Sequence, residues 1–599
     1  MHKARNILSR RRFIQLCGAG LFVTGLQATF PLPLWARTER WGLEGLPTSR
    51  SCYDLNISYT PLKIDGRRSM ATGINGTVPG PLVRLREGDE VTLRVTNSMV
   101  DTTHSSIHWH GILVPFPMDG VPGVNFPGIA PGETFEYRYK VVQAGTYWYH
   151  SHSFLQEQSG AYGPLIIDPK GGEPFHFDRD YAVVLSDWSF EKPEDIFRNI
   201  NLLGHYYNYQ QRTLGDFFAD VEDRGLKSTL KERMAWGKMR MSPVDLADVT
   251  GATYTYLMNG NSPDMNWTAL FNPGETIRLR FINAAAMSNF DVRIPGLDMQ
   301  VVMVDGKAVR PVPVHEFRIG VAETYDVLVR PQQDKPFTLF AESLDRSGYA
   351  RGTLAPEPGL EAAVPKMRVR PVRRLEDIGM GMMMNGGHGK HDGQMGMDHG
   401  SMENKMAAQH GKKAIEPDSR IPGPNGPEPF LPDKQHSSSV AMVVRNPSYR
   451  LHEPGIGLGD DGWRVLTYED LESAEPQVYA DQPEREMTIN ITANMERYMF
   501  SFDGMKFTEH PGPYLFRYNE RLRLFLVNHT MMEHPIHLHG MWMQLENGAD
   551  RLPYKHTLLV KPGEVMSVLI TPIEKGDWAF HCHLLYHMEA GMFQVVRVA

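Results

Sequence analysis

The stretch Gly576-Asp577-Trp578-Ala579-Phe580-His581-Cys582-His583 lies near the C-terminus of a chain of 599 residues. A related stretch, GTYWYHSH, ends at His152, and a matching Pro-Gly-Glu precedes each stretch, at Pro131 and at Pro562. In both cases the two copies are 431 residues apart. A repeat of this kind indicates a duplicated structural unit, so we expect the first and last parts of the chain to be copies of one domain.

A third copy of the domain is indicated by a strand-like segment that occurs three times. It reads GDEVTLRVTN up to Asn97, GETIRLRFIN up to Asn283 and NERLRLFLVN up to Asn528. Polar and apolar residues alternate in all three segments, as in half-buried strands. The residues that follow the middle copy, AAAMSNFDV, contain no histidine pair. The middle domain is therefore expected to share the scaffold and to lack the histidines.

Length and composition favour several β-domains. A chain of 599 residues is too long for one hydrophobic core, and its 55 Gly and 43 Pro residues separate short strand-like runs. We predict an all-β chain with domains at residues 45–172, 173–372 and 438–599, and with a helical insertion in the second domain. Residues 373–437 are predicted to form a linker, first rich in Met, His and Gly and then rich in Pro.

The N-terminus resembles a twin-arginine signal peptide, predicted here as residues 1–36. Ser9-Arg10-Arg11-Arg12-Phe13 precedes an apolar stretch that Gly and Pro residues interrupt. We therefore favour export to the bacterial periplasm over a membrane anchor, and expect no membrane span once the signal is removed. The net charge of -8 makes nucleic acid an improbable partner.

Cysteine usage directs attention to one residue. Of the three cysteines, Cys17 lies in the signal, which leaves Cys52 and Cys582 in the exported chain. The chain therefore lacks the disulfide framework of many secreted proteins. We predict that Cys582 is present for its thiolate.

Eight histidines occur as four pairs with one residue between the members. Side chains two positions apart on a strand face the same way, so each pair can bind one metal ion or two adjacent ions. One such pair is weak evidence, because many strands carry histidines by chance. Four pairs with repeated spacing indicate a metal cluster, and their members are His108, His110, His150, His152, His537, His539, His581 and His583.

A second group of candidate ligands overlaps the opening stretch. Two histidines, a thiolate and a weakly bound methionine describe a blue-copper site, and His534, Cys582, His587 and Met592 supply this set. If Cys582 faces that copper, strand alternation turns its two neighbours, His581 and His583, to the opposite face.

The motifs HWHG, HSH, HPIHLHG and HCHLLYHMEAGM resemble those of the three-domain multicopper oxidases over nearly the whole mature chain. The resemblance implies three cupredoxin-like Greek-key β-sandwich domains and four copper ions, one of type 1, one of type 2 and two of type 3. It also implies that a reducing substrate gives single electrons to the type 1 copper, and that the cluster reduces dioxygen to water.

The resemblance further implies a ligand set for each copper. The type 1 copper takes His534, Cys582, His587 and Met592, and the type 2 copper takes His108 and His537. One type 3 copper takes His110, His150 and His583, and the other takes His152, His539 and His581.

Two acidic residues are expected to take part in proton transfer. Asp119 matches an acidic proton carrier of relatives, although Asp-Gly is also an ordinary turn. Relatives often carry an acidic residue directly after the second type 1 histidine. Here Met588 holds that position, and Glu589 is predicted to substitute.

The composition of the predicted linker gives an indication of the substrate. Residues 380–406 are rich in Met and His, and soft thioethers select Cu(I), so an extra Cu(I) site is predicted there. This stretch and the signal resemble the periplasmic copper-resistance protein A group, which implies oxidation of Cu(I) to Cu(II) in copper resistance. A laccase-like phenol oxidase and a copper-binding protein are the alternatives. The sequence does not indicate an oligomeric state.

Overall fold

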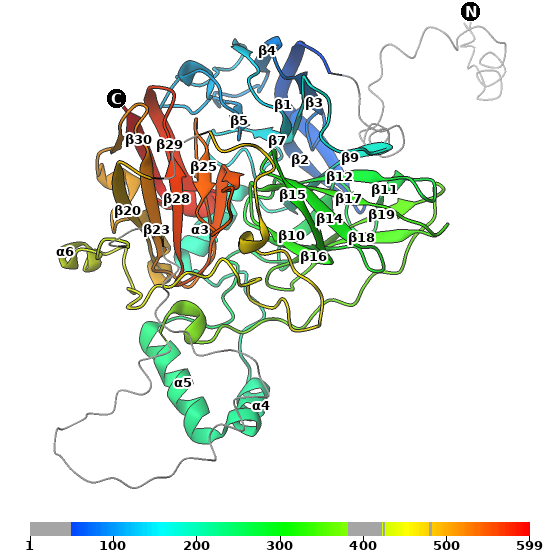
Figure 1. Cartoon of the computed structure of the whole chain (residues 1–599). Helices are drawn as coiled ribbons and strands as arrows, with labels where there is room; N and C mark the ends of the chain where they lie inside the picture. The colour runs from blue at the N-terminus through cyan, green and yellow to red at the C-terminus, as the bar shows by residue number, and fades with distance from the viewer. Residues whose placement is uncertain (1–48, 381–421, 423–425, 479–481) are drawn as a thin grey trace, which may run out of the picture.

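The computed structural model describes residues 49–380, 422, 426–478 and 482–599. The predicted signal peptide and nearly all of the Met-rich stretch, from residue 381 onward, lie outside the described residues. Within the described residues, no helix is both long enough and apolar enough to cross a membrane. The strands form six sheets, two for each of three consecutive parts of the chain (Figure 1).

The first domain pairs two four-stranded sheets. One has the order β2 (Arg67–Ile74), β1 (Cys52–Ile64), β4 (Glu90–Asn97), β6 (Thr134–Lys140). The other has the order β3 (Val83–Arg86), β8 (Tyr162–Asp168), β7 (Gly145–His150), β5 (His108–His110). Two of the histidine pairs therefore lie on or directly after neighbouring strands of one sheet.

The second domain is built from a six-stranded and a five-stranded sheet. The first has the order β10 (Tyr254–Met258), β9 (Arg179–Ser189), β12 (Ile277–Asn283), β17 (Thr324–Val329), β14 (Met299–Val304), β15 (Lys307–Val314). The second has the order β11 (Trp267–Leu270), β19 (Tyr349–Ala355), β18 (Phe337–Ser343), β13 (Phe290–Arg293), β16 (Glu316–Ile319).

The third domain repeats the arrangement of the second. Its six-stranded sheet has the order β21 (Met499–Phe502), β20 (Arg485–Asn494), β23 (Leu522–Asn528), β28 (Val565–Ile570), β25 (Met543–Leu545), β26 (Tyr554–Lys555). Its five-stranded sheet has the order β22 (Tyr514–Phe516), β30 (Phe593–Val598), β29 (Gly576–Cys582), β24 (His534–Leu538), β27 (Thr557–Val560).

The three repeated segments form equivalent strands, which are β4, β12 and β23. Each pairs in parallel with the first strand of its domain and antiparallel with a later one. A fully buried asparagine ends each strand: Asn97, Asn283 and Asn528. Through Nδ2 each donates to two backbone carbonyls, those of Thr103 and Ile129, of Ser288 and Ile319, and of Met532 and Val560. The same side chain therefore ties the strand to two other segments in every domain.

Helices are few and lie mainly in one insertion. The second domain carries α3 (Pro193–Leu202), α4 (Leu214–Arg224) and α5 (Leu226–Met239) between β9 and β10. Figure 1 shows α4 and α5 extending away from the sheets. Outside the insertion are α6 (Pro432–Gln435) and α7 (Leu585–Glu589). The predicted all-β architecture with a helical insertion is thus confirmed, while the exact domain limits remain predictions.

Replacement of Asn283 by Ala tests the asparagine tie in the domain that has no histidine pair. Buried carbonyls left without a donor cost about 1–3 kcal/mol each, so we expect a clear fall in the thermal unfolding midpoint. Calorimetry of the copper-free chain would measure it. Asn201→Ala, at an exposed helix position, serves as the control, and an equal effect of both variants would contradict the prediction.

Candidate metal centre

Strand pairing brings the four histidine pairs together from the two ends of the chain. In the first domain His108 on β5 lies opposite His150 on β7. In the third domain His537 on β24 lies opposite His581 on β29. The two sheets face each other, and ring centroids of His110 and His537 lie 3.8 Å apart in a stacked arrangement. We call the eight residues of the four pairs the eight-histidine cluster.

The ligand atoms of this cluster gather into groups small enough for single metal ions. In each of three groups, all ligand atoms lie within 4.8 Å of one another: His110, His150 and His583; His152, His539 and His581; and His108, His537 and His539. The first two groups coincide with the sets predicted for the type 3 coppers, and the third contains both residues predicted for type 2.

Unpaired nitrogens within the cluster indicate that it is built for metal ions. Within the described part of the chain, several buried ring nitrogens have no hydrogen-bond partner; they are Nε2 of His108, His110, His150, His537 and His583, and also Nδ1 of His110. A buried polar atom without a partner is costly. Copper coordination would use these lone pairs, so the donor set fits copper.

Burial also keeps the cluster in the protonation state that metal binding requires. The pKa values of His110, His150 and His539 lie well below the ordinary value. Desolvation is the main cause, and repulsion between neighbouring charged rings is the second. Burial lowers the pKa of His581 to about 4. These rings are therefore neutral near pH 7, and neutral imidazole is the form that coordinates a metal.

Backbone and carboxylate groups hold several rings from behind. Nδ1 of His108 lies 2.7 Å from the Asp119 carbonyl oxygen, and Nδ1 of His537 lies 2.6 Å from that of His556. Asp119 also places Oδ2 2.9 Å from Nδ1 of His539, where the Asn125 amide donates to the same oxygen. The structure therefore places the predicted Asp119 between two histidines of the cluster.

The second group of predicted ligands lies on the other face of β29. Cys582 Sγ is 3.5 Å from Nδ1 of His534 and 3.8 Å from Nδ1 of His587. The two Nδ1 atoms are 3.2 Å apart. Met592 is fully buried, and its backbone N–H donates to the His587 carbonyl while its carbonyl accepts the Cys582 N–H. We call these four residues the cysteine group.

Burial raises the pKa of the Cys582 thiol, so the thiol is protonated in the metal-free protein. Metal binding at this site therefore releases a proton.

The outer nitrogens of both histidines in the cysteine group are occupied. Nε2 of His587 donates to Oδ2 of Asp248 over 2.6 Å, and Nε2 of His534 lies 2.8 Å from Oγ1 of Thr530. Phe500 stacks on the His587 ring with centroids 3.7 Å apart. Asp248 comes from the second domain, so the domain without histidine pairs orients a ligand of the third.

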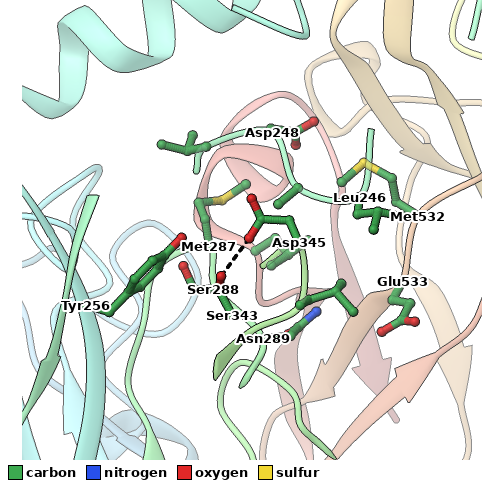
Figure 2. A pocket seen from close by; sticks show the side chains of 14 residues that line it. Leu246, Asp248, Tyr256, Met287, Ser288, Asn289, Ser343, Asp345, Met532 and Glu533 are labelled. Carbon is green, nitrogen blue, oxygen red and sulfur yellow. Dashed lines mark hydrogen bonds between the residues drawn. The ribbon is translucent and has the colours of Figure 1, made fainter. Parts of the chain in front are cut away.

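A pocket borders the cysteine group, because Asp248, the partner of His587, is part of its lining. Figure 2 shows the three acidic side chains of the pocket, Asp248, Asp345 and Glu533, and all three are buried. Its lining includes Asp248, Met287, Asp345, Met532 and Glu533, which we call the acidic methionine pocket. Leu584, from the loop between Cys582 and His587, forms part of its wall. The pocket therefore combines soft sulfur and hard oxygen donors next to the cysteine group.

Sequence reasoning missed several residues at the two sites. His556, buried next to the cluster, shares a group of close ligand atoms with His110 and His537, and Glu157 lies behind His150. Asp248 and Thr530 belong to no motif that the sequence analysis used. Only the position of Thr530, four residues before His534, could have drawn attention to it. The others come from segments whose contact with the ligands is set by tertiary packing.

The predicted Glu589 lies at the C-terminal end of α7 and is half-buried. Burial raises its pKa to about 7, a value suited to proton exchange at neutral pH. Its predicted role as a substitute acid stays a prediction.

Several known proteins are similar to this chain. The multicopper oxidase family matches residues 56–172, 212–359 and 481–599. The chain is 48% identical to a copper resistance protein A homolog from Pseudomonas syringae pv. tomato, over 98% of this chain and 99% of that protein. Identity to copper resistance protein A from Escherichia coli is also 48%, over 98% and 99% of the two chains.

A solved structure supports the fold independently. The crystal structure of Fet3p, described as a multicopper oxidase that functions in iron import, superposes with a TM-score of 0.60 at 19% identity. The match covers 91% of this chain and 90% of that one. The fold, the three matched regions and the full-length relatives agree with the resemblance that the motifs predicted. The chain belongs to the multicopper oxidase family of oxidoreductases.

Proposed function

We propose that the protein oxidises Cu(I) to Cu(II) and couples this to the four-electron reduction of dioxygen to water. The observation that carries the choice of substrate is the hydrogen bond from His587 to Asp248, which links the cysteine group to the acidic methionine pocket. The names of the relatives suggest a role in copper resistance.

The proposed ligand sets are those that the family resemblance implied. The cysteine group would hold a type 1 copper, and His108 with His537 a type 2 copper. The two three-histidine groups would hold a type 3 pair. The bound copper ions would supply one-electron redox chemistry on the substrate side and store the four electrons that dioxygen requires. The three close groups of histidine ligand atoms support this distribution.

The chain itself connects the two sites. Peptide bonds join Cys582 to His581 and to His583, so a bonded path of a few atoms runs from the thiolate to both three-histidine groups. Hydrogen bonds to Asp248 and Thr530 hold the His587 and His534 rings with Nδ1 directed at Cys582. These residues thereby orient the donors of one site while Cys582 links it to the other.

The pocket supports Cu(I) as substrate over phenols. Met287 and Met532 offer thioethers, which select Cu(I), and the carboxyl groups of Asp248 and Asp345 line the same pocket. Glu533 also lines the pocket, where it is paired with Arg318. Both histidines of the cysteine group are fully buried, with their outer nitrogens already bonded within the protein. A phenol would have to displace one of these contacts to reach the ring edge.

Proton delivery and cellular location complete the proposal. Asp119 contacts two histidines of the cluster and is proposed as a proton carrier to dioxygen, with Glu589 as a second acid. We propose that the signal at residues 1–36 exports the protein to the periplasm. An additional Cu(I) site in residues 380–406 would collect the substrate, and a copper-binding protein without oxidase activity is the competing function.

Replacement of Cys582 by Ser tests the ligand assignment. We expect the intense blue absorption of the copper-loaded protein to disappear, because the colour of such sites arises from the copper-thiolate bond. The eight-histidine cluster should keep its copper, as measured by metal analysis and electron paramagnetic resonance. Cys52→Ser is the matched control, since Cys52 is exposed. Blue colour in Cys582→Ser would refute the assignment.

The double variant with Met287→Leu and Met532→Leu tests the substrate pocket. Leucine keeps a similar volume and removes the thioether, so we expect KM for Cu(I) to rise about tenfold, a loss of about 1.4 kcal/mol in binding. Oxygen uptake with Cu(I) and with a phenol would measure the effect. Met566→Leu, in the buried core on β28, is the control. Unchanged Cu(I) kinetics, or an equal loss with the phenol, would contradict the assignment.

A further inference from the structure

Glu157 is a buried carboxyl beside the eight-histidine cluster. It lies five residues after His152, in the turn between β7 and β8, and its side chain is 3% exposed. Its Oε2 atom lies 2.7 Å from Nδ1 of His150. The interaction joins residues of the first domain only, so it does not depend on how the domains are arranged.

The contact determines which nitrogen of His150 is available for a metal. A neutral imidazole carries one N–H, and an acceptor at Nδ1 places that hydrogen on Nδ1. Nε2 then keeps a free lone pair, and this atom is buried without a hydrogen-bond partner within the described residues. The ligand atoms of His110 and His583 complete its group. The carbonyl of Ser151, 3.1 Å from Nδ1, is a longer alternative acceptor.

The other three-histidine group has a counterpart to Glu157. There Oδ2 of Asp119 lies 2.9 Å from Nδ1 of His539. Nδ1 of His581, in that same group, lies 3.0 Å from a backbone carbonyl oxygen, that of Cys582. Each three-histidine group therefore has one histidine backed by a buried carboxyl, Asp119 for one and Glu157 for the other.

The Glu157 carboxyl has few hydrogen-bond partners for a buried group, which argues against a purely structural role. Its second oxygen, Oε1, is buried and has no hydrogen-bond partner in the part of the chain that the structure describes. The contact with His150 is the one hydrogen bond or ion pair recorded there for this carboxyl. Burying a carboxyl with so little compensation is costly, and the contact with His150 is the interaction that offsets part of this cost.

We infer that Glu157 is a positioning residue for one copper of the type 3 pair, fixing the tautomer and ring orientation of His150 so that Nε2 faces the metal. The inference rests on the ligand sets proposed above. Partners behind metal ligands typically contribute 10–100-fold in metal affinity or activity, so Glu157 should affect the pair and leave the cysteine group unchanged.

The test compares Glu157→Leu with Glu157→Gln in the copper-loaded full chain. Leucine removes the acceptor, whereas the amide oxygen of glutamine can still accept from Nδ1. We expect copper affinity at one site to fall by about 10–100-fold in Glu157→Leu. Metal analysis should then show copper content falling from four ions towards three. A magnetically coupled copper pair gives no electron paramagnetic resonance signal, so loss of one copper of the pair should make the remaining one visible. Glu157→Gln should largely restore the wild-type copper content and resonance.

Controls separate this inference from the proposed function. The blue absorption of the cysteine group reports correct folding in every variant. Glu232→Leu removes a buried glutamate of the helical insertion, where it pairs with Arg212 and Arg224, and should leave the pair intact. Wild-type copper content and resonance in Glu157→Leu would overturn the inference, and so would equal losses in the Leu and Gln variants. A wild type without a coupled pair would overturn the ligand sets as well.

Discussion

The two sites depend on the alternation of side chains along β29. His581 and His583 face the eight-histidine cluster because Cys582, between them, faces the other way. A strand fixes this separation through its pleat alone, without any further contact. One short segment can therefore contribute side chains to two candidate metal sites and join them through covalent bonds.

The middle domain carries no histidine pair, yet it contacts both neighbouring domains through buried charged groups. At the junction with the first domain, Arg278 and Thr146 both contact the buried carboxylate of Asp326. At the junction with the third domain, Lys555 lies between Asp305 and Glu323, all fully buried. Because an unpaired buried charge is strongly destabilising, such pairs hold the domains in one arrangement. The cluster, which draws ligands from the first and third domains, requires that arrangement.

The same domain brings acidic and sulfur groups to the cysteine group. The segment after β12, which has no histidines, supplies Met287 to the pocket, and its backbone N–H groups are held by the buried carboxylate of Asp187. The Ala286 carbonyl accepts the N–H of Leu585, at the start of α7. The segment that carries histidines in the other two domains thus contacts the third domain in this one.

Much of the architecture could be predicted from sequence. The repeated strands that end at Asn97, Asn283 and Asn528 indicated three related domains, and the spacing of the histidine pairs indicated which ligands share a face. Both patterns can be read from short stretches of sequence, because the alternation of side chains along a strand depends only on neighbouring residues. The sets His110, His150 and His583 and His152, His539 and His581 came from the family resemblance, and the structure places the same residues together.

The partners behind the ligands were decided by tertiary structure alone. Glu157, Asp248 and His556 reach the sites from a turn, an insertion and a strand end, positions that carry no periodic signal in the sequence. Asp248 is 339 residues from the histidine that it contacts. Some of these contacts form within one domain, as between Glu157 and His150, and others form only when domains pack against one another, as between Asp248 and His587. The sequence by itself therefore determined the donors and their alternation, and tertiary packing, both within and between domains, decided how each donor is oriented.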